Sequence, residues 1–301
     1  MRKQIVIIYF FIIGCINAPH SNIYDPENPH KARITGSVRE PDGTPLENAV
    51  IALFQGEKMI QSDTSDGEGV FMLDDITPGI YKIEATALYY TMVEISPETL
   101  WAGTKLNGFD IYFSTLHFDN EAAGTASAYG FETITGDWNI MNDNGQTTEH
   151  SLPNVYNGKN KNTEKALVLY SMDFGDFKFK TKLKILNSTE ENWEAGIVFR
   201  YRNEENHYCL KISSDTLSLV KKENGIQKAV AVVECATPKE KWFSLGVECY
   251  FTVIKTYLND QLMFYEVNNV LTSGRAGLTV MNKIPTQTTS VNFDDVTITT
   301  D

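Results

Sequence analysis

The chain has 301 residues, of which 42% are hydrophobic and 22% are charged, so it is long enough for two ordinary domains with apolar cores. Its 26 basic and 39 acidic side chains give a formal net charge of −13. Nucleic-acid phosphates are bound by basic faces, so this balance argues against general nucleic-acid binding.

The first residues predict a lipid-anchored, extracytoplasmic protein. A basic MRK start is followed by an apolar run over residues 5–13, which is too short to span a bilayer. The run ends in IIGC at Cys15, which resembles the lipobox of a bacterial lipoprotein signal peptide. The resemblance implies that residues 1–14 are removed and that Cys15 carries acyl chains, which anchor stably when more than one is present. The alternative is an ordinary secretory signal with an incidental cysteine.

The residue after Cys15 is Ile16 rather than the Asp that retains some lipoproteins in the inner membrane, so we expect the bacterial outer membrane. Residues 15–31 are polar, with three prolines and no periodicity, and are expected to be a tether.

Residues 32–114 predict a small all-β sandwich. Short alternating strands such as RITGSV, AVIALF and IYKIEA are separated by turn residues every eight to twelve positions. The succession GSVREPDGTPLENAVIAL, TSDGEGVFML and ITPGIYKIEA resembles the carboxypeptidase regulatory-like domain, an Ig-like module. That resemblance implies a spacer or folding partner. A peptidase is excluded, because no histidine in the chain is followed by Glu at the His-x-x-Glu spacing of the zinc domain.

Residues 115–136 have a small-residue centre and are expected to be a linker, and residues 137–301 predict a second all-β domain. Its clearest strand begins at residue 174, where KFKTKLKI alternates lysines with apolar residues. Residues 242–255 are expected to be one long strand. So many strands with no convincing helix predict a jelly-roll sandwich of two curved sheets.

The stretch WEAGIVFRYRNEENHYCLKI, residues 193–212, predicts two strands joined by a tight polar turn. One face of the hairpin can be buried, and the other is expected to carry Arg200, Arg202, His207 and Lys211. The phrases ALVLYSMDFGDFKFKTKLKI, EAGIVFRYRNEENHYCLKI and EKWFSLGVECYFTVIKTYLNDQLMF resemble the concanavalin A-like family, and within it laminin-G-like and levan-binding carbohydrate modules and a hydrolase of 3-keto-disaccharides.

Catalysis has little support in the sequence. Retaining glycosidases of this fold place two carboxylates about 5 Å apart on one strand, and no Glu-x-Asp-x-x-Glu run occurs. Adjacent carboxylate pairs point to opposite faces of a strand. No Gly-x-Ser-x-Gly elbow occurs either. Whether the chain is an enzyme stays open, with a glycoside hydrolase as the less favoured answer.

Binding of a polysaccharide or oligosaccharide is the function we favour from the sequence, because sugars pack on aromatic faces and bond to planar polar groups. The resemblance places the hairpin where relatives bind, which gives six candidate ligand-binding residues: Trp193, Arg200, Tyr201, Asn206, His207 and Tyr208. The alternative for Tyr201 and Tyr208 is burial in the core. The rival function is structural or adhesive, with a protein partner.

No cofactor is expected apart from calcium, for which Asp294 and Asp295 are candidate ligands and strand-end surface charges are the alternative. The lysines at 178, 180, 182 and 184 are expected to form a solvated convex face rather than a site for an acidic polysaccharide. Cys209, Cys235 and Cys249 are expected to be buried thiols, with one disulfide and one thiol as the alternative.

Overall fold

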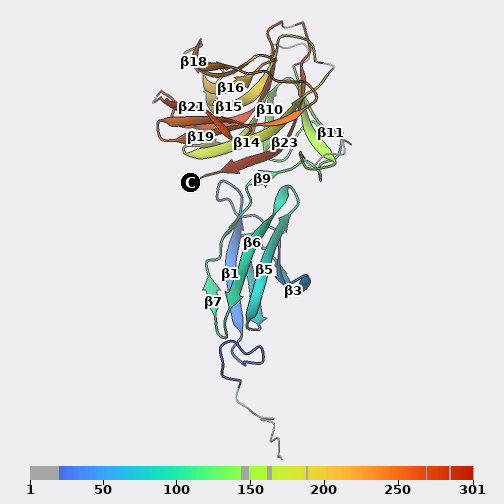
Figure 1. Ribbon diagram of the computed structural model, residues 1–301, viewed down its shortest axis with the longest axis vertical. Coiled ribbons are helices and arrows are strands. Elements are labelled where there is room, and N and C mark those ends of the chain that lie inside the picture. The colour runs from blue at the N-terminus through green and yellow to red at the C-terminus, as the bar shows by residue number, and fades with distance from the viewer. Residues whose placement is uncertain are drawn as a thin grey trace, which may run out of the picture.

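The computed structural model describes residues 20–143, 149–160, 165–187, 189–268, 270–284 and 286–300. These residues form strands, turns and loops without any α-helix, which confirms the predicted all-β class. Within them there is accordingly no helix that could cross a membrane. The expected signal peptide and Cys15 lie outside the described residues. Figure 1 shows a slender lower module and a broader upper module.

The lower, N-terminal module is a two-sheet sandwich. One sheet has the order β4-β1-β7, with β8 also paired to β1, and the other contains the run β6-β5-β2-β3. The strands are β1 (Ala32–Arg39), β2 (Val50–Gln55), β3 (Lys58–Thr64), β4 (Val70–Ile76), β5 (Gly79–Ala87), β6 (Tyr90–Leu100), β7 (Lys105–Asn107) and β8 (Ile111–Tyr112).

Alternation of side chains builds the core of this module. On β5, Tyr81, Ile83 and Ala85 are buried, whereas Ile80, the residue before Tyr81, faces solvent. Equivalent apolar side chains from both sheets fill the space between them: Ile34, Ile51, Leu53, Phe71, Leu73 and Phe113. The hydrophobic pattern therefore fixes which face of each strand turns inward.

The upper, C-terminal module is a larger sandwich. One sheet has seven strands in the order β10-β13-β22-β15-β16-β17-β18, and the facing sheet contains the run β21-β20-β19-β14-β23, with β12 on β23 and β11 on β12. The strands are β10 (Phe131–Thr135), β11 (Asp137–Asn142), β12 (Asn154–Lys159), β13 (Lys165–Phe174), β14 (Phe177–Ile185), β15 (Trp193–Asn203), β16 (Asn206–Ile212), β17 (Thr216–Glu223), β18 (Ile226–Glu234), β19 (Trp242–Tyr250), β20 (Val253–Leu258), β21 (Gln261–Val267), β22 (Gly274–Asn282) and β23 (Ser290–Thr299).

Strands far apart in the sequence are neighbours in both sheets of this module. β14 pairs with β23, and both β13 and β15 pair with β22, all antiparallel. Long-range antiparallel pairing of this kind is typical of a jelly roll. Its core contains the predicted apolar faces of β14 and of the hairpin, with Phe177, Phe179, Leu183, Ile197 and Phe199 buried.

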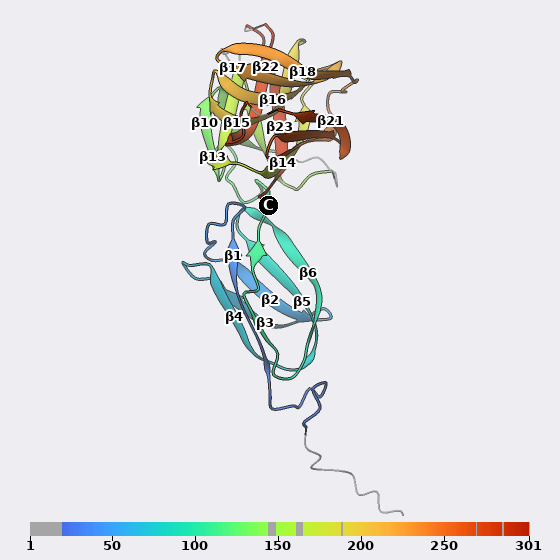
Figure 2. The same ribbon diagram turned by 90° about the vertical axis from the view of Figure 1, so that its left-hand side faces the viewer.

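The two modules are joined by hydrogen-bonded sheet rather than by a free connection. Strand β9 (Thr115–Leu116) pairs with β23 on one side and, through Leu116, with Tyr90 of β6 on the other. The C-terminal end of the chain therefore lies at the junction of the modules, as Figures 1 and 2 show. Residues 115–136, which we expected to be a linker, thus contain β9 and β10, both within sheets.

Tyrosines pack across the same junction. The ring of Tyr129 stacks on that of Tyr89, with centroids 4.3 Å apart, and the Tyr129 hydroxyl donates to the Glu40 carboxylate. Burial raises the pKa of Glu40 and that of Tyr129 above their ordinary values. The junction is therefore held by an apolar contact and a charge-assisted hydrogen bond, as well as by the sheet.

The predicted long strand over residues 242–255 is wrong, because the chain turns back between β19 and β20. Phe251 in this turn has a φ of 49°. The turn residues are aromatic and β-branched, so nothing in their types indicates a turn. Side chains from elsewhere satisfy the backbone of Phe251 and hold the turn in place.

Candidate functional site

The hairpin formed by β15 and β16 has a tight polar turn at the predicted place, with Asn203 paired to Asn206. The alternation of β15 is broken by a β-bulge before that turn. Val198 pairs with Gly277 and the next pair along is Tyr201 with Arg275, so two residues of β15, Phe199 and Arg200, lie opposite one residue of β22, Ala276. Arg200 has a φ of 48°, in the left-handed region, and its side chain joins Phe199 on the core side. The bulge therefore moves Arg200 inward and Tyr201 outward.

The Arg200 guanidinium bonds to loops of the opposite sheet. Its Nη1 donates to the carbonyl of Leu271 at 2.9 Å, and its Nη2 donates to the carbonyl of Phe251 at 2.6 Å. The amide of Phe251 donates to Asp176 Oδ1 at 2.7 Å. Arg200 and Asp176 thus satisfy both backbone groups of Phe251, which explains how an aromatic residue occupies this turn.

Three predicted ligand-binding residues are corrected by their burial. Trp193, Arg200 and Tyr208 are 1%, 0% and 0% exposed, and all three lie between the sheets. Tyr208 stacks on Phe199 with ring centroids 5.4 Å apart. These side chains contribute to the core and cannot contact a ligand on the surface. Burial in the core was the alternative given for Tyr208 from the sequence, and the structure shows it.

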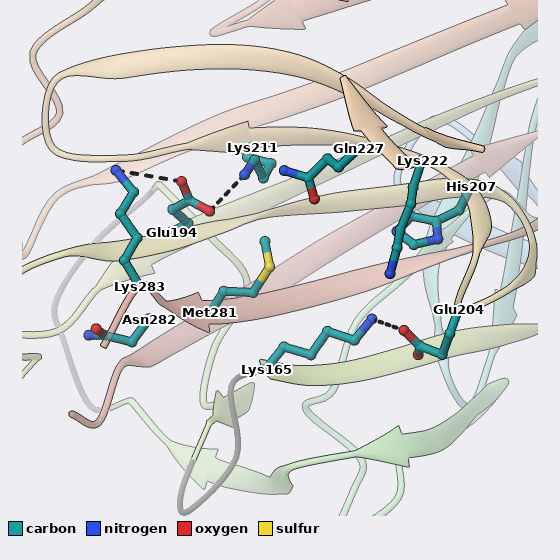
Figure 3. A pocket seen from close by; sticks show the side chains of 10 residues that line it. All are labelled: Lys165, Glu194, Glu204, His207, Lys211, Lys222, Gln227, Met281, Asn282 and Lys283. Atoms are coloured by element: carbon teal, nitrogen blue, oxygen red, sulfur yellow. Dashed lines mark hydrogen bonds and ion pairs between the residues drawn. The ribbon is translucent and has the colours of Figure 1, made fainter. Parts of the chain in front are cut away.

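The outward face of the seven-stranded sheet contains a groove of about 400 Å³. Strands β13, β22, β15, β16, β17 and β18 lie side by side beneath it (Figure 3). In both whole-molecule views β16 and β18 lie farther from the N-terminal module than β14 and β23 do (Figures 1 and 2). Ten residues line the groove: Lys165, Glu194, Glu204, His207, Lys211, Lys222, Gln227, Met281, Asn282 and Lys283.

The floor of the groove is apolar. Val198, Cys209 and Val220 are direct partners on three adjacent strands, and each is at most 6% exposed. Val198 and Cys209 pack with Leu167 and Leu169 in a cluster separate from the main core. This cluster lies beneath the groove, and Met281, which packs on it and lines the groove, is the apolar side chain that a ligand can contact.

Charged side chains form the rim in two groups, which Figure 3 shows on either side of Met281. In one group Glu194 accepts from Lys211 at 2.8 Å and lies 3.7 Å from the ammonium of Lys283. In the other, Glu204 pairs with Lys165. Register places Lys222 directly across from both His207 and Gln227, beside this second pair. The rim therefore offers charged donors and acceptors at both ends.

The other three predicted ligand-binding residues lie at or near the groove and stay predictions. His207 lines it, and burial lowers the pKa of this histidine, so the imidazole is neutral at pH 7. The Tyr201 ring lies 5.5 Å from that of His207, and its hydroxyl donates to Glu204 at 3.2 Å. Asn206 stabilises the turns, since its amide donates to Asn203 and its Oδ1 accepts from the Asn224 backbone.

The ionisable groups in the groove do not resemble a hydrolytic pair. Burial acts to raise the pKa of Glu204, but the hydrogen bond and charge of Lys165 outweigh it and the pKa is lowered. A glycosidase acid needs the opposite shift. Burial also raises the pKa of Cys209 to about 12, so this thiol stays protonated and weakly nucleophilic.

The proposed calcium ligands are engaged by protein groups. Asp294 is fully buried, and its Oδ2 accepts from His150 Nδ1 and Ser151 Oγ, both at 2.9 Å. Asp295 points elsewhere and pairs with Lys182 at 2.9 Å. In the part of the chain that the structure describes, no three His, Cys, Asp or Glu residues are grouped to hold a metal. The calcium hypothesis is therefore corrected to two separate structural contacts.

The cysteines are free in the described structure, as expected. Cys209 and Cys249 are buried, whereas Cys235 is only partly buried, which corrects the expectation for that residue. Cys235 follows the end of β18, where its backbone amide bonds to Asp215 rather than to a strand of the core.

Sequence analysis missed most of the groove residues. Lys165, Lys222 and Met281 lie on three different strands, and only the register brings them together. Each occupies an outward position on a strand whose other face is apolar, and this is the one sequence signal that could have singled them out.

Comparison with known families agrees with the predicted organisation of the N-terminal module. Residues 33–112 match the carboxypeptidase regulatory-like domain. This match covers strands β1 to β8, and it does not extend to the groove. No curated protein matches the chain.

Among solved structures, the chain is similar to the carbohydrate binding module CBM66 from Bacillus subtilis, with 21% identity and a TM-score of 0.47 over 59% of this chain and 99% of that one. It is also similar to the β-glucanase of Bacillus licheniformis, at 9% identity and a TM-score of 0.44, over 62% of this chain and 99% of that one. A third similar structure is the cellulose induced protein Cip1, at 14% identity and a TM-score of 0.44, over 61% and 96% of the two chains.

Proposed function

We propose that the protein is a non-catalytic carbohydrate-binding protein of the bacterial envelope, with an oligosaccharide held in the groove of the seven-stranded sheet. The observation that carries the proposal is the combination of an apolar floor with a rim of hydrogen-bonding side chains. A sugar ring presents C–H groups on its faces and hydroxyl groups at its edge. The Met281 side chain above the Val198 cluster suits the faces, and Gln227 and the ion pairs suit the hydroxyls.

The size and openness of the groove suit a short chain of sugars. Its volume of about 400 Å³ lies within the range of roughly 300–1,000 Å³ for ligand pockets. Its polar residues come from strands rather than from long loops, so the geometry of the rim is set before a ligand binds. Preorganisation of this kind lowers the entropic cost of binding.

The proposal is tested by glycan arrays and calorimetry with residues 20–301, which begin where the described residues begin. Val198 lies in the apolar cluster beneath the groove, so Val198→Phe pushes this cluster and Met281 up into the groove, and we expect at least a tenfold loss of affinity. Val50→Phe is the matched control, because Val50 is exposed on β2 of the other module. Silence across neutral and charged glycans, or equal binding by Val198→Phe, would contradict the proposal.

Envelope attachment through Cys15 is the second part of the proposal and rests on the IIGC sequence. We expect the full-length protein to partition into the detergent phase in Triton X-114 extraction, and Cys15→Ser to move it to the aqueous phase. Cys235→Ser is the control, since Cys235 is a free thiol at the surface of the C-terminal module. Equal partitioning of the two variants would argue against lipidation.

A further inference from the structure

The groove carries an excess of positive charge in a strongly acidic protein. Four lysines and two glutamates line it, whereas the whole chain has a net charge of −13. A concave surface lined by one sign of charge concentrates ligands of the other sign. This local reversal of charge therefore bears on which glycans the groove would take.

The excess is divided between the two ends of the groove. At one end Lys211 and Lys283 share the single carboxylate of Glu194, and Lys211 holds it at the shorter distance of 2.8 Å. At the other end Lys165 and Lys222 accompany the single carboxylate of Glu204. Each end thus has two ammonium groups for one carboxylate among the described lining residues.

One lysine at each end is open to a ligand. Lys283 is 56% exposed on its side chain, and its distance to Glu194 is the longer one, 3.7 Å. Lys222 is half-buried and has no ion-pair partner in the described parts of the chain. Its cross-strand neighbours, His207 and Gln227, are uncharged at pH 7, since burial lowers the pKa of the histidine. The Coulomb attraction between a half-buried ammonium group and an incoming anion is stronger than at a fully exposed site, because the effective dielectric constant is lower there.

We propose that the natural ligand is an acidic oligosaccharide, with anionic groups that bind Lys222 at one end of the groove and Lys283 at the other. This inference rests on the proposed glycan-binding function and specifies its ligand class. A carboxylate of a uronic acid and a sulfate ester present the same chemistry to a lysine. The test therefore includes both.

The experiment measures affinity by calorimetry for residues 20–301 with three sets of oligosaccharides. These are oligogalacturonates, which carry carboxylates, chondroitin sulfate oligosaccharides, which carry carboxylates and sulfates, and neutral cello- and fructo-oligosaccharides. We expect at least one acidic set to bind at least tenfold more tightly than the neutral sets. Raising NaCl from 0.05 to 0.5 M is expected to weaken this binding severalfold, because salt screens exposed charges.

Three variants locate the binding site of the anionic groups. Lys222→Gln and Lys283→Gln are each expected to weaken binding of the acidic set about fivefold, which corresponds to about 1 kcal/mol per charged contact. Lys228→Gln is the matched control. Lys228 is exposed on β18 beside Gln227, and alternation directs it away from the groove, so we expect less than a twofold change.

The outcomes separate this inference from the function on which it rests. Preference for an acidic set that is reduced about fivefold in each groove variant supports the inference, and the preferred set identifies the anionic group. Tight binding of neutral glycans, unaffected by Lys222→Gln and Lys283→Gln but weakened by Val198→Phe, overturns the ligand class and leaves the proposed function standing. Absence of binding to every set overturns both.

Discussion

Two faces of the C-terminal module carry rows of lysines, and the two rows differ in their partners. On the outer face of β14, Lys180 pairs with Asp260, Lys182 with Asp295 and Lys184 with Asp143, each within 3 Å. In the groove of the seven-stranded sheet, two glutamates pair with three of the four lysines, and Lys222 has no ion pair among the described residues. The comparison shows that cross-strand neighbours, rather than the number of lysines, decide whether a basic row is neutralised or open to a ligand.

The neutralised row explains why the regular KFKTKLKI pattern was a poor indicator of function. Its aspartates come from other segments of the chain and reach the row only in the folded structure. Lys184 also lies over the Trp242 ring, 5.1 Å from its centroid. Exposed ion pairs contribute about 0–1 kcal/mol each, so the row stabilises modestly and leaves little free charge.

The largest expected effect comes from Arg200, whose bulge decides which hairpin residues face the groove. Arg200→Ala removes the donors for the buried carbonyls of Leu271 and Phe251 and leaves a cavity, so we expect the free energy of unfolding to fall by about 3 kcal/mol. Chemical denaturation measures this loss. Arg202→Ala, at an exposed neighbour, should change it by less than about 0.5 kcal/mol. Equal effects would contradict the structural role of the bulge.

The free energy of unfolding is expected to depend on pH through the buried carboxyl of Asp294. Burial raises the pKa of its carboxyl from 3.8 to about 6, so the folded state binds this proton more tightly than the unfolded state. Stability from this group is therefore present at low pH and is lost as the pH rises from about 4 to about 6, by at most about 1.4 kcal/mol per pH unit. The hydrogen bond from His150 acts on the pKa of Asp294 in the opposite direction to burial.

Asp294→Asn removes this titration and is expected to gain stability relative to the wild type across the same interval. Urea unfolding at pH 4, 5, 6 and 7 measures the difference between the two proteins. The difference should grow up to about pH 6 and then level off. A difference that is constant over the four pH values would show that Asp294 keeps an ordinary pKa.

A smaller loss of stability is expected for a lysine on the outer face of β14, and it distinguishes this row from the groove lysines. Lys184→Gln breaks the pair with Asp143 and the contact with Trp242, so we expect a loss of about 1 kcal/mol in stability and no change in glycan affinity. Thermal unfolding and calorimetry measure the two quantities. A loss of glycan affinity in this variant would move the binding site from the groove to the outer face of β14.

The smallest effect on stability is expected in the groove itself. Lys222 has no ion pair to lose among the described residues, so Lys222→Gln should change the free energy of unfolding by less than about 0.5 kcal/mol. Chemical denaturation of Lys222→Gln and of Lys184→Gln under the same conditions measures the two changes in the free energy of unfolding. A loss as large as that of Lys184→Gln would mean that Lys222 is structural.

Much of the fold could be predicted from the sequence because strand alternation is a local signal. The apolar face of β14 and the Asn203–Asn206 hairpin turn follow directly from it. The bulge at Arg200 does not, because a single inserted residue reverses the phase without any change in composition. The turn at Phe251 was missed for a related reason, since it depends on Asp176 and Arg200 from distant segments.

The groove was predicted only in part, since a site built on a sheet depends on register. His207 was identified because it lies in the hairpin, and the predicted polar face of that hairpin also included Lys211. Lys165, Lys222 and Met281 come from other strands, and their positions beside the hairpin depend on pairing across the whole sheet. Trp193 and Tyr208 were chosen as candidate ligand-binding residues because sugars pack on aromatic rings, yet both side chains are buried in the core.

The β9 bridge determines how the groove is presented. β9 hydrogen-bonds to both β23 and Tyr90, and Tyr129 packs on Tyr89. The two modules are therefore joined by sheet pairing and side-chain packing rather than by a flexible linker. The direction in which the groove opens is then set by the junction. A change in the length of the segment before β1 would therefore leave the angle between the two modules unchanged.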